Sequence, residues 1–415
     1  MIPSVDVYLS AGDDGLDVLV GRARFNLRRG SVSTAFSYDE NYLASEDAFV
    51  IDPALPLQAS PLYLDGLPGA FRDSAPDRWG RRLISRRLRA EADVTGALRS
   101  LDDVDYLLGV HDDARQGALR YSATGSDERL SADGEVPPQI EMPRLLAASN
   151  RIAGELGNAD DVKTLLDAGS GSLGGARPKA SVMDGGRLLL AKFSHPGDGW
   201  HVMRWERFAL FVARGAGLSV PECRLVSVGP DDVLLLERFD REGGYACGRR
   251  LPYMSAMTLL AAQDGESRDY AELAEALVDV VADAGDALRD VFMRAALSIA
   301  IHNTDDHLRN IGLVRMGHAW RLAPCFDVNP NPALSEPRVT GVFGEVGSAE
   351  VEGLRALAPI CGLSEREAAG CVSRVLRALG GWKTAAMRLG CPRSEVELFA
   401  PVFADRCEGL TAAFR

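Results

Sequence analysis

Residues 299–313 combine charged and metal-competent side chains with apolar residues on both sides. Within this stretch Asp305 and Asn310 stand five positions apart, a spacing used by phosphoryl-transfer enzymes. In such enzymes the carboxylate orients the acceptor hydroxyl and the amide oxygen holds Mg²⁺. A second carboxylate, Asp327, follows a short strand-like stretch. The pattern predicts a catalytic loop in which Asp305 lies beside the acceptor and Asn310 and Asp327 bind Mg²⁺.

Two histidines lie in the same stretch. His307 stands close to acidic residues, so its imidazole is a candidate metal ligand or general base. We favour a supporting role in the catalytic loop for His307, because the pattern Asp-x-His-x-x-Asn is the form found in phosphoinositide-type kinases. His302 is expected to pack at the end of the preceding helix. The all-oxygen ligand set favours Mg²⁺ or Mn²⁺ over zinc.

A glycine- and serine-rich segment at residues 169–175 contains four glycines in seven positions. Such a backbone can approach phosphate oxygens through its N–H groups, although the run is not a GxxxxGK[ST] motif and a plain loop is the alternative. Residues 187–193 follow as a predicted strand with Lys192 near its end, which favours nucleotide binding. The candidate phosphate-binding residues are Ser172, Gly174, Gly175, Ala176, Lys179 and Lys192.

The order of the next elements supports the same interpretation. A predicted helix at 202–213 carries one carboxylate, Glu206, which can pair with Lys192; a surface glutamate is the alternative. Predicted strands at 223–228 and 233–241 follow, and the second ends in a charged, glycine-rich turn. A glycine loop, a strand lysine, a helix glutamate, a strand and a hinge occur in this order in the small lobe of a kinase fold.

The remaining chain is expected to supply the framework for these elements. Residues 5–42 alternate apolar and polar positions, which predicts a small antiparallel β unit. Residues 81–89 indicate a basic helix with a solvated face, residues 102–122 a helix and a strand, and residues 140–156 a helix. From residue 252 onward the apolar spacing is helical, at 255–260, 270–283, 287–301, 349–380 and 394–413.

Composition narrows the class of protein. The chain has 415 residues, 46% hydrophobic content and a formal charge of −13, so it lacks the basic footprint of a nucleic-acid-binding protein. Seven scattered cysteines without a CxxC pair argue against a disulfide framework or a zinc site. No export signal or membrane span is expected, and a cytoplasmic location follows from these features.

Four segments carry a resemblance to the HipA family of bacterial serine/threonine kinases, which are toxins of type II toxin-antitoxin systems. They are Ser172-Leu-Gly-Gly-Ala-Arg-Pro-Lys179, Leu236-Glu-Arg-Phe-Asp-Arg241, Asn303-Thr-Asp-Asp-His-Leu-Arg-Asn310 and Ala323-Pro-Cys-Phe-Asp-Val-Asn-Pro330. Residues 76–81 and 117–120 are similar to the N-terminal subdomain of the family.

The resemblance implies an α+β, two-lobed, protein-kinase-like (phosphoinositide-kinase-like) fold with a small β-rich N-terminal subdomain and an all-helical C-terminal lobe. We place the N-terminal subdomain at 1–125, the small-lobe core at 138–245 and the C-terminal lobe at 246–415. The expected partner is a HipB-like DNA-binding antitoxin, through which DNA is contacted only indirectly, and the expected substrate is a protein, with a tRNA-charging enzyme as one family target. The expected cofactors are ATP and Mg²⁺.

The resemblance also assigns roles to individual residues. Autophosphorylation of a glycine-loop serine, which switches off ATP binding in the family, maps onto Ser172, with Ser170 as a second candidate. Backbone groups of Glu237 and Phe239 are expected to bind adenine, and Phe326 to pack near the base. Three alternatives remain at this point: a catalytically weak kinase-like scaffold in an antitoxin-DNA complex, a small-molecule or lipid kinase, and a metal-dependent phosphoesterase.

Overall fold

The computed structural model describes residues 4–10, 17–28, 31–96, 100–131, 136–170, 177–243, 248–263, 265–266 and 268–415. The chain divides into two units, each formed from several segments. Unit 1 comprises Met1–Gly197, Val226–Met254 and Val314–His318, and unit 2 comprises Asp198–Leu225, Ser255–Leu313 and Ala319–Arg415. The glycine-loop candidates Ser172, Gly174, Gly175 and Ala176 lie outside the described residues.

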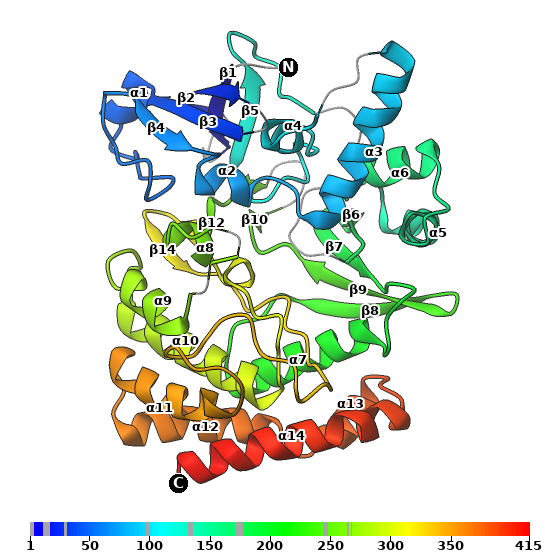
Figure 1. The fold of residues 1–415 in the computed structure, drawn as a ribbon, viewed down its shortest axis with the longest axis vertical. Coiled ribbons are helices and arrows are strands. Elements are labelled where there is room, and N and C mark those ends of the chain that lie inside the picture. The colour runs from blue at the N-terminus through cyan, green and yellow to red at the C-terminus, as the bar shows by residue number, and fades with distance from the viewer. Residues whose placement is uncertain are drawn as a thin grey trace. The chain divides into compact units, whose positions relative to one another are not determined.

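Unit 1 begins with a five-stranded antiparallel sheet of order β4-β3-β2-β1-β5, drawn mainly in blue in Figure 1. Every second residue of β3 is buried because successive side chains of a strand point to opposite faces of the sheet. Phe36 and Tyr38 of β3 pack with Phe71 and Tyr121 in the hydrophobic core on the buried face of this sheet. The predicted β unit is confirmed, with bounds β1 Ser4–Ser10, β2 Asp17–Arg28, β3 Ser31–Tyr38, β4 Leu62–Asp65 and β5 Leu119–Ala123.

Three short helices and one long helix lie between β3 and β5 in the described part of the chain. The long helix α3 confirms the predicted basic helix and extends beyond 81–89 at both ends. Its N-cap is Asp77, whose side chain accepts a hydrogen bond from the N–H of Gly80 at 2.8 Å, and it ends at Gly96 in the left-handed region. The bounds are α1 Glu40–Ala44, α2 Gly69–Asp73, α3 Arg78–Thr95 and α4 Asp103–Leu108.

A second sheet, of order β6-β7-β9-β8, follows in the chain. Apolar residues of β6, β7 and β9 pack against α5, and α6 packs against α5 and α3. Predicted strands 187–193 and 223–228 are confirmed at these bounds, whereas helix α6 was not predicted. The elements are η1 Gln139–Glu141, α5 Met142–Ala153, α6 Ala159–Asp167, β6 Lys179–Asp184, β7 Arg187–Phe193, β8 Cys223–Val228 and β9 Asp231–Glu237.

Unit 2 is largely helical. Helix α10 is buried over most of its length, and an aromatic cluster joins α7, α13 and α14. In that cluster Trp205 stacks on Phe399 with ring centroids 3.9 Å apart. The helices are α7 Val202–Ala216, α8 Ala256–Leu259, α9 Tyr270–Leu277, α10 Ala284–Ala300, η2 Leu308–Asn310, η3 Gly347–Ala349, α11 Glu350–Ile360, α12 Glu365–Ala378, α13 Trp382–Arg388 and α14 Arg393–Ala413.

The helical C-terminal region agrees with the prediction, and it also contains short strands. The segment predicted as one helical region at 349–380 is two helices, α11 and α12, separated at Cys361–Ser364. The short strands are β11 Arg249–Arg250, β12 Tyr253–Ser255, β13 Gly312–Met316 and β14 Ala319–Leu322. Strand β10 Arg241–Glu242, which pairs with β11, precedes this region. Among the described residues, no helix has both the length and the apolar character needed to cross a membrane.

Candidate active site

The catalytic loop begins where helix α10 ends. The N–H of His302 donates to the carbonyl of Ile299 at 3.0 Å, and the N–H of Asn303 donates to that of Ser298 at 2.9 Å, which is the hydrogen-bond pattern of a Schellman motif. His302 has φ +52°, a left-handed backbone that usually favours glycine or asparagine at this position. Its ring Nε2 hydrogen-bonds the carbonyl of Ala333 at 3.0 Å. The predicted packing of His302 at the helix end is confirmed.

The two neighbouring acids of the loop have different surroundings. Asp306 is 5% exposed, and its Oδ2 accepts hydrogen bonds from Tyr270 Oη and Ser298 Oγ, both at 2.6 Å. Asp305 is exposed. Because Asp306 is fixed inside unit 2 and Asp305 faces outward, Asp305 is the carboxylate of the pair that a substrate can reach.

Asp306 also begins a buried chain of alternating charges. Arg338 Nη1 lies 3.3 Å from Asp306 Oδ2, and Arg338 Nε donates to Glu350 Oε2 at 2.9 Å. Glu350 Oε1 in turn lies 3.0 Å from Arg406 Nη1 of α14. The four side chains are at most 8% exposed, so each charge depends on its neighbours for compensation. This chain ties the catalytic loop to the start of α11 and to the middle of α14.

Asn310 is fastened to the same loop. Its Nδ2 donates to the backbone carbonyl of Asp305 at 3.0 Å, which leaves the amide Oδ1 as the atom able to face a cation. The chain then forms the hairpin of β13 and β14, after which the N–H of Ala323 donates to the carbonyl of Gly312 at 2.8 Å. The hairpin therefore brings the segment leading to Asp327 back to the segment that follows Asn310.

The donor chemistry around Asp327 suits a hard cation. Asp327 has φ +55°, and its Oδ1 accepts a hydrogen bond from Asn329 Nδ2 at 3.1 Å. Asn329 Oδ1, next to Asp327, and Asn303 Oδ1, in the catalytic loop, are buried and have no hydrogen-bond partner within the part of the chain that the structure describes. Buried oxygens of this kind call for an explanation such as a bound ion. Carboxylate and amide oxygens suit Mg²⁺, and Asn329, which the sequence alone did not single out, adds a candidate oxygen donor beside Asp327. The binding of Mg²⁺ by Asn310 and Asp327 stays a prediction.

His307 has a half-buried ring. Its Nδ1 is buried without a hydrogen-bond partner in the described ranges, and its carbonyl accepts from the N–H of Asn310 at 2.8 Å. The backbone of His307 therefore helps to form the turn η2 that carries Asn310. The supporting role expected for its side chain remains a prediction.

In unit 1 the structure brings two predicted lysines together. Lys179 and Lys192 are directly opposite each other in the β6–β7 pair and are 2% and 6% exposed. Two like charges at opposing positions are unfavourable unless another group compensates them. Asp77 supplies one carboxylate, with Oδ2 2.6 Å from Lys179 Nζ. Lys179, expected to contact phosphate, thus has a buried ion pair with the N-cap of α3.

Ser170 lies at the same place. It is 0% exposed, its Oγ hydrogen-bonds the carbonyl of Lys179, and Trp79 Nε1 lies 3.5 Å from that Oγ. A phosphate on Ser170 has no room in this arrangement, so modification there requires the side chain to leave. Ser172, the first candidate for autophosphorylation, lies outside the described residues.

The other predicted residues are distributed between the two units. Glu237 and Phe239 lie in unit 1, where Glu237 pairs with Arg187 at 3.1 Å and the Phe239 ring lies 6.1 Å from that of Tyr253. Glu206 lies in unit 2 and is 1% exposed, which rules out the alternative of a surface glutamate. Its pairing with Lys192 joins residues of different units and stays a prediction, as does the packing of Phe326 near adenine.

Comparison with known proteins identifies the family. A family model described as the HipA-like C-terminal domain matches residues 171–382, and a model of the HipA N-terminal domain matches residues 17–121. The chain belongs to the HipA family. The C-terminal match contains Lys192, Asp305, Asn310 and Asp327, and the N-terminal match contains Asp77.

Two further proteins show how far the likeness extends. The Toxin YjjJ of Escherichia coli strain K12 is 24% identical over 286 residues, which are 65% of this chain and 61% of that protein, so the match spans less than two thirds of its length. HipA from the Shewanella oneidensis MR-1 complex of HipA, HipB and operator DNA has a TM-score of 0.69 and 15% identity, covering 98% of this chain and 97% of its own. The latter match confirms a HipA fold, with a β-rich N-terminal region and a helical C-terminal region.

A partial structural likeness is also found to the Helicobacter pylori proinflammatory kinase CtkA. It covers 57% of this chain and 94% of that protein at 13% identity, with a TM-score of 0.39. This score is too low to establish a shared fold.

Proposed function

We propose that this HipA-family protein is an ATP-dependent serine/threonine protein kinase that acts in the cytoplasm as the toxin of a bacterial toxin-antitoxin system. The observation that carries the proposal is the division between Asp305 and Asp306. One carboxylate is held by Tyr270 and Ser298, while its neighbour is exposed on a loop that also fixes Asn310. This is the arrangement that an acceptor-orienting aspartate requires.

In this proposal Asp305 orients the acceptor hydroxyl, and Asn310 and Asp327 hold Mg²⁺, which neutralises charge on the ATP phosphates when both are bound. Lys192, paired with Glu206, contacts the α/β-phosphates, and Lys179 lies across the strand pair from it. The backbone of Glu237 and Phe239 binds adenine. A HipB-like antitoxin as partner is supported by the HipA, HipB and operator DNA complex whose HipA shares this fold. Autophosphorylation of Ser172, or of Ser170 once exposed, would switch the enzyme off.

The test is incubation of the full-length protein with labelled ATP and Mg²⁺, alone and with cell lysate. We expect label on Ser172 or Ser170 and on a lysate protein, and we expect Asp305→Asn to abolish both. Asp279→Asn, which changes an exposed aspartate in the turn after α9, is the matched control and should keep full activity. Tight ATP binding without label on any protein would favour a kinase-like scaffold, and label only on small molecules or lipids would favour a small-molecule kinase.

The toxin part of the proposal has its own readout. Expression of the protein without an antitoxin should inhibit growth, and the Asp305→Asn variant should not. Growth inhibition that persists in a stable, fully expressed Asp305→Asn variant would contradict kinase activity as its cause.

A further inference from the structure

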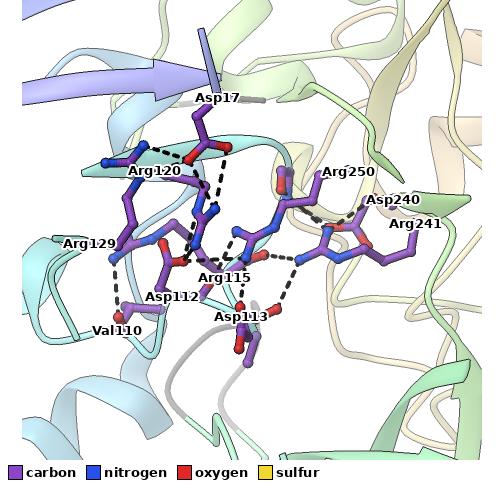
Figure 2. A network of polar contacts seen from close by, with 12 residues as sticks. Asp17, Val110, Asp112, Asp113, Arg115, Arg120, Arg129, Asp240, Arg241 and Arg250 are labelled. Atoms are coloured by element: carbon purple, nitrogen blue, oxygen red, sulfur yellow. Dashed lines mark hydrogen bonds and ion pairs between the residues drawn. The ribbon is translucent and has the colours of Figure 1, made fainter. Parts of the chain in front are cut away.

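A network of arginines and aspartates joins parts of unit 1 that are far apart in the sequence, residues 112–117 on one side and residues 238–241 with Arg250 on the other (Figure 2). At its centre is Asp240, which is 1% exposed. Its carboxylate accepts from Arg238 Nε and Nη2 at 2.7 and 2.6 Å, from Arg241 Nη1 at 2.9 Å and from the N–H of Gly117 at 2.8 Å. One carboxylate thus holds two guanidinium groups and one backbone amide of the opposite segment. We call Arg238, Asp240 and Arg241 the hinge clamp.

The two arginines of the hinge clamp bind the backbone of the opposite segment. Arg238 Nη1 donates to the carbonyl of Ala114 at 3.0 Å, and Arg241 Nη2 donates to the carbonyls of Arg115 and Asp113 at 2.7 and 3.2 Å. Hydrogen bonds with a charged donor are stronger than neutral ones, and a buried carbonyl without a hydrogen-bond partner lowers the stability of the folded protein. The backbone of residues 113–117 is therefore fixed to the hinge clamp at several consecutive positions.

The 112–117 segment is anchored in turn to the N-terminal sheet. Arg250 donates to the carbonyl of Asp112 at 2.9 Å, and the Asp112 carboxylate pairs with Arg120 of β5, which reaches Asp17 of β2 at 3.0 Å (Figure 2). Burial opposes ionisation of Asp112, but the guanidinium groups of Arg250 and Arg120 lower the pKa of its carboxyl below the usual value. Ion pairs thus connect the sheet to Asp112 and Asp113, and the backbone carbonyls of residues 113–115 connect this segment to the hinge clamp.

The hinge clamp sits next to the residues assigned to adenine. Burial alternates along the segment, with Arg238 and Asp240 buried and Glu237 and Phe239 only half-buried. Strand β9 ends at Glu237, and Phe239 and Asp240 lie in the turn that follows it. Arg238 and Asp240, which stand on either side of Phe239 in the sequence, bind the 112–117 segment directly after the end of the strand that carries Glu237.

We propose that Asp240, together with Arg238 and Arg241, positions the hinge backbone at Glu237 and Phe239 for binding the adenine of ATP. The N-terminal domain takes part in this positioning through residues 113–117. The proposal rests on the kinase function proposed above. Hydrogen bonds to a base require donor and acceptor within a few tenths of an ångström of their best positions. If the contacts between the hinge clamp and residues 113–117 are lost, the backbone of Glu237 and Phe239 is no longer held in position for adenine. The N-terminal domain is therefore part of the nucleotide site in this proposal.

The first experiment measures nucleotide binding by full-length variants that are shown to be folded. Asp240→Asn keeps the size of the side chain and removes the charge that holds both guanidinium groups. We expect its Kd and KM for ATP to rise about tenfold, with kcat at saturating ATP unchanged within about a factor of two. Inorganic triphosphate, which has no base, should bind equally well to the variant and the unmodified protein.

A second variant and a matched control separate positioning from general damage. Arg241→Lys keeps a positive charge beside Asp240 but cannot reach two carbonyls at once, and we expect a smaller rise in Kd for ATP, about threefold. Arg249→Gln removes a partly exposed ion pair with Glu242, at 2.6 Å between the paired strands β10 and β11, and should leave the Kd for ATP unchanged. Folded Asp240→Asn and Arg241→Lys variants with unchanged affinity for ATP would overturn the proposal.

Hydrogen exchange on the unmodified protein gives a test that needs no variant. ATP should slow exchange of the backbone amides of residues 113–117 as well as those of the hinge, because the N–H of Gly117 is bonded to Asp240. Protection of the hinge alone would show that the N-terminal domain does not share in adenine binding and would overturn the proposal. Absence of ATP binding by the unmodified protein is a different result, because it removes the kinase function itself.

Discussion

The hydroxyl of Tyr270 donates a hydrogen bond of 2.6 Å to the carboxylate of Asp306, one residue after the proposed acceptor-orienting Asp305. Burial, followed by the neighbouring Asp306 carboxylate, raises the pKa of Tyr270 well above 10, so the phenol remains protonated and able to donate throughout the neutral range. The hydrogen bond holds the buried side of the catalytic loop at Asp306, while Asp305 stays exposed.

We expect Asp306→Asn to disturb this arrangement without changing its size. Loss of the charge leaves Arg338 with a weaker partner inside unit 2, so the free energy of unfolding should fall by about 3 kcal/mol and label transfer from ATP should fall with it. Chemical denaturation and the phosphorylation assay measure the two effects. Arg355→Gln, which removes an exposed pair with Glu352, is the control and should change neither. Full stability and activity in Asp306→Asn would contradict this account of the loop.

The ion pair between Asp77 and Lys179 allows a second prediction, on stability. Asn is as good an N-cap as Asp, so Asp77→Asn keeps the cap of α3 and removes only the charge beside the buried Lys179. We expect the free energy of unfolding to fall by about 3 kcal/mol, measured by urea denaturation. Glu397→Gln in the exposed Arg393–Glu397 pair should change it by less than about 0.5 kcal/mol. Equal effects of the two substitutions would show that the buried pair contributes little.

Gly353 of α11 provides a third prediction. A Cβ at this position would lie 1.9 Å from the backbone carbonyl oxygen of Val342, which cannot rotate away. Gly353→Ala should therefore destabilise the protein by about 2–3 kcal/mol in thermal or chemical unfolding. Gly370 of α12 has no atom within 4 Å of its added Cβ, and Gly370→Ala should stabilise by about 0.5–1 kcal/mol. The same sign of change in both variants would mean that α11 can shift away from residue 342.

The fourth prediction concerns pH. Burial lowers the pKa of His302 from its usual 6.5, and the guanidinium groups of Arg406 and Arg338 act in the same direction. The folded state then binds a proton less readily than the unfolded state, so the contribution of His302 to stability is complete above about pH 6.5 and decreases as the pH falls below it. Urea unfolding between about pH 5.5 and 7.5 measures the slope.

His302→Asn suits the left-handed backbone and should reduce this slope, whereas the same substitution at the exposed His318 should leave it unchanged. A slope that is identical in the unmodified protein and in His302→Asn would show that protonation of His302 is not linked to folding.

Local patterns in the sequence predicted local structure well. Strands 187–193 and 223–228 agree with the prediction at both ends because their apolar runs are bounded by turn residues. Helix α6 was missed, although Asn158 and Asp161 form a capping box that marks its start. The buried ion pairs could not be predicted from the sequence. Arg338 lies 32 residues from Asp306 beside the catalytic loop of unit 2, and Asp77 lies 102 residues from Lys179 in unit 1. Such pairs depend on the folded chain and leave no periodic signal.

The chain passes between the two units five times, after residues 197, 225, 254, 313 and 318. Unit 1 therefore includes a return of only five residues, Val314–His318, encoded far downstream of the rest. No single cut in the gene yields either unit whole. Recombination that exchanges front and rear halves between relatives would combine pieces of both units from two parents, so the two units are expected to be inherited and to diverge together as one piece.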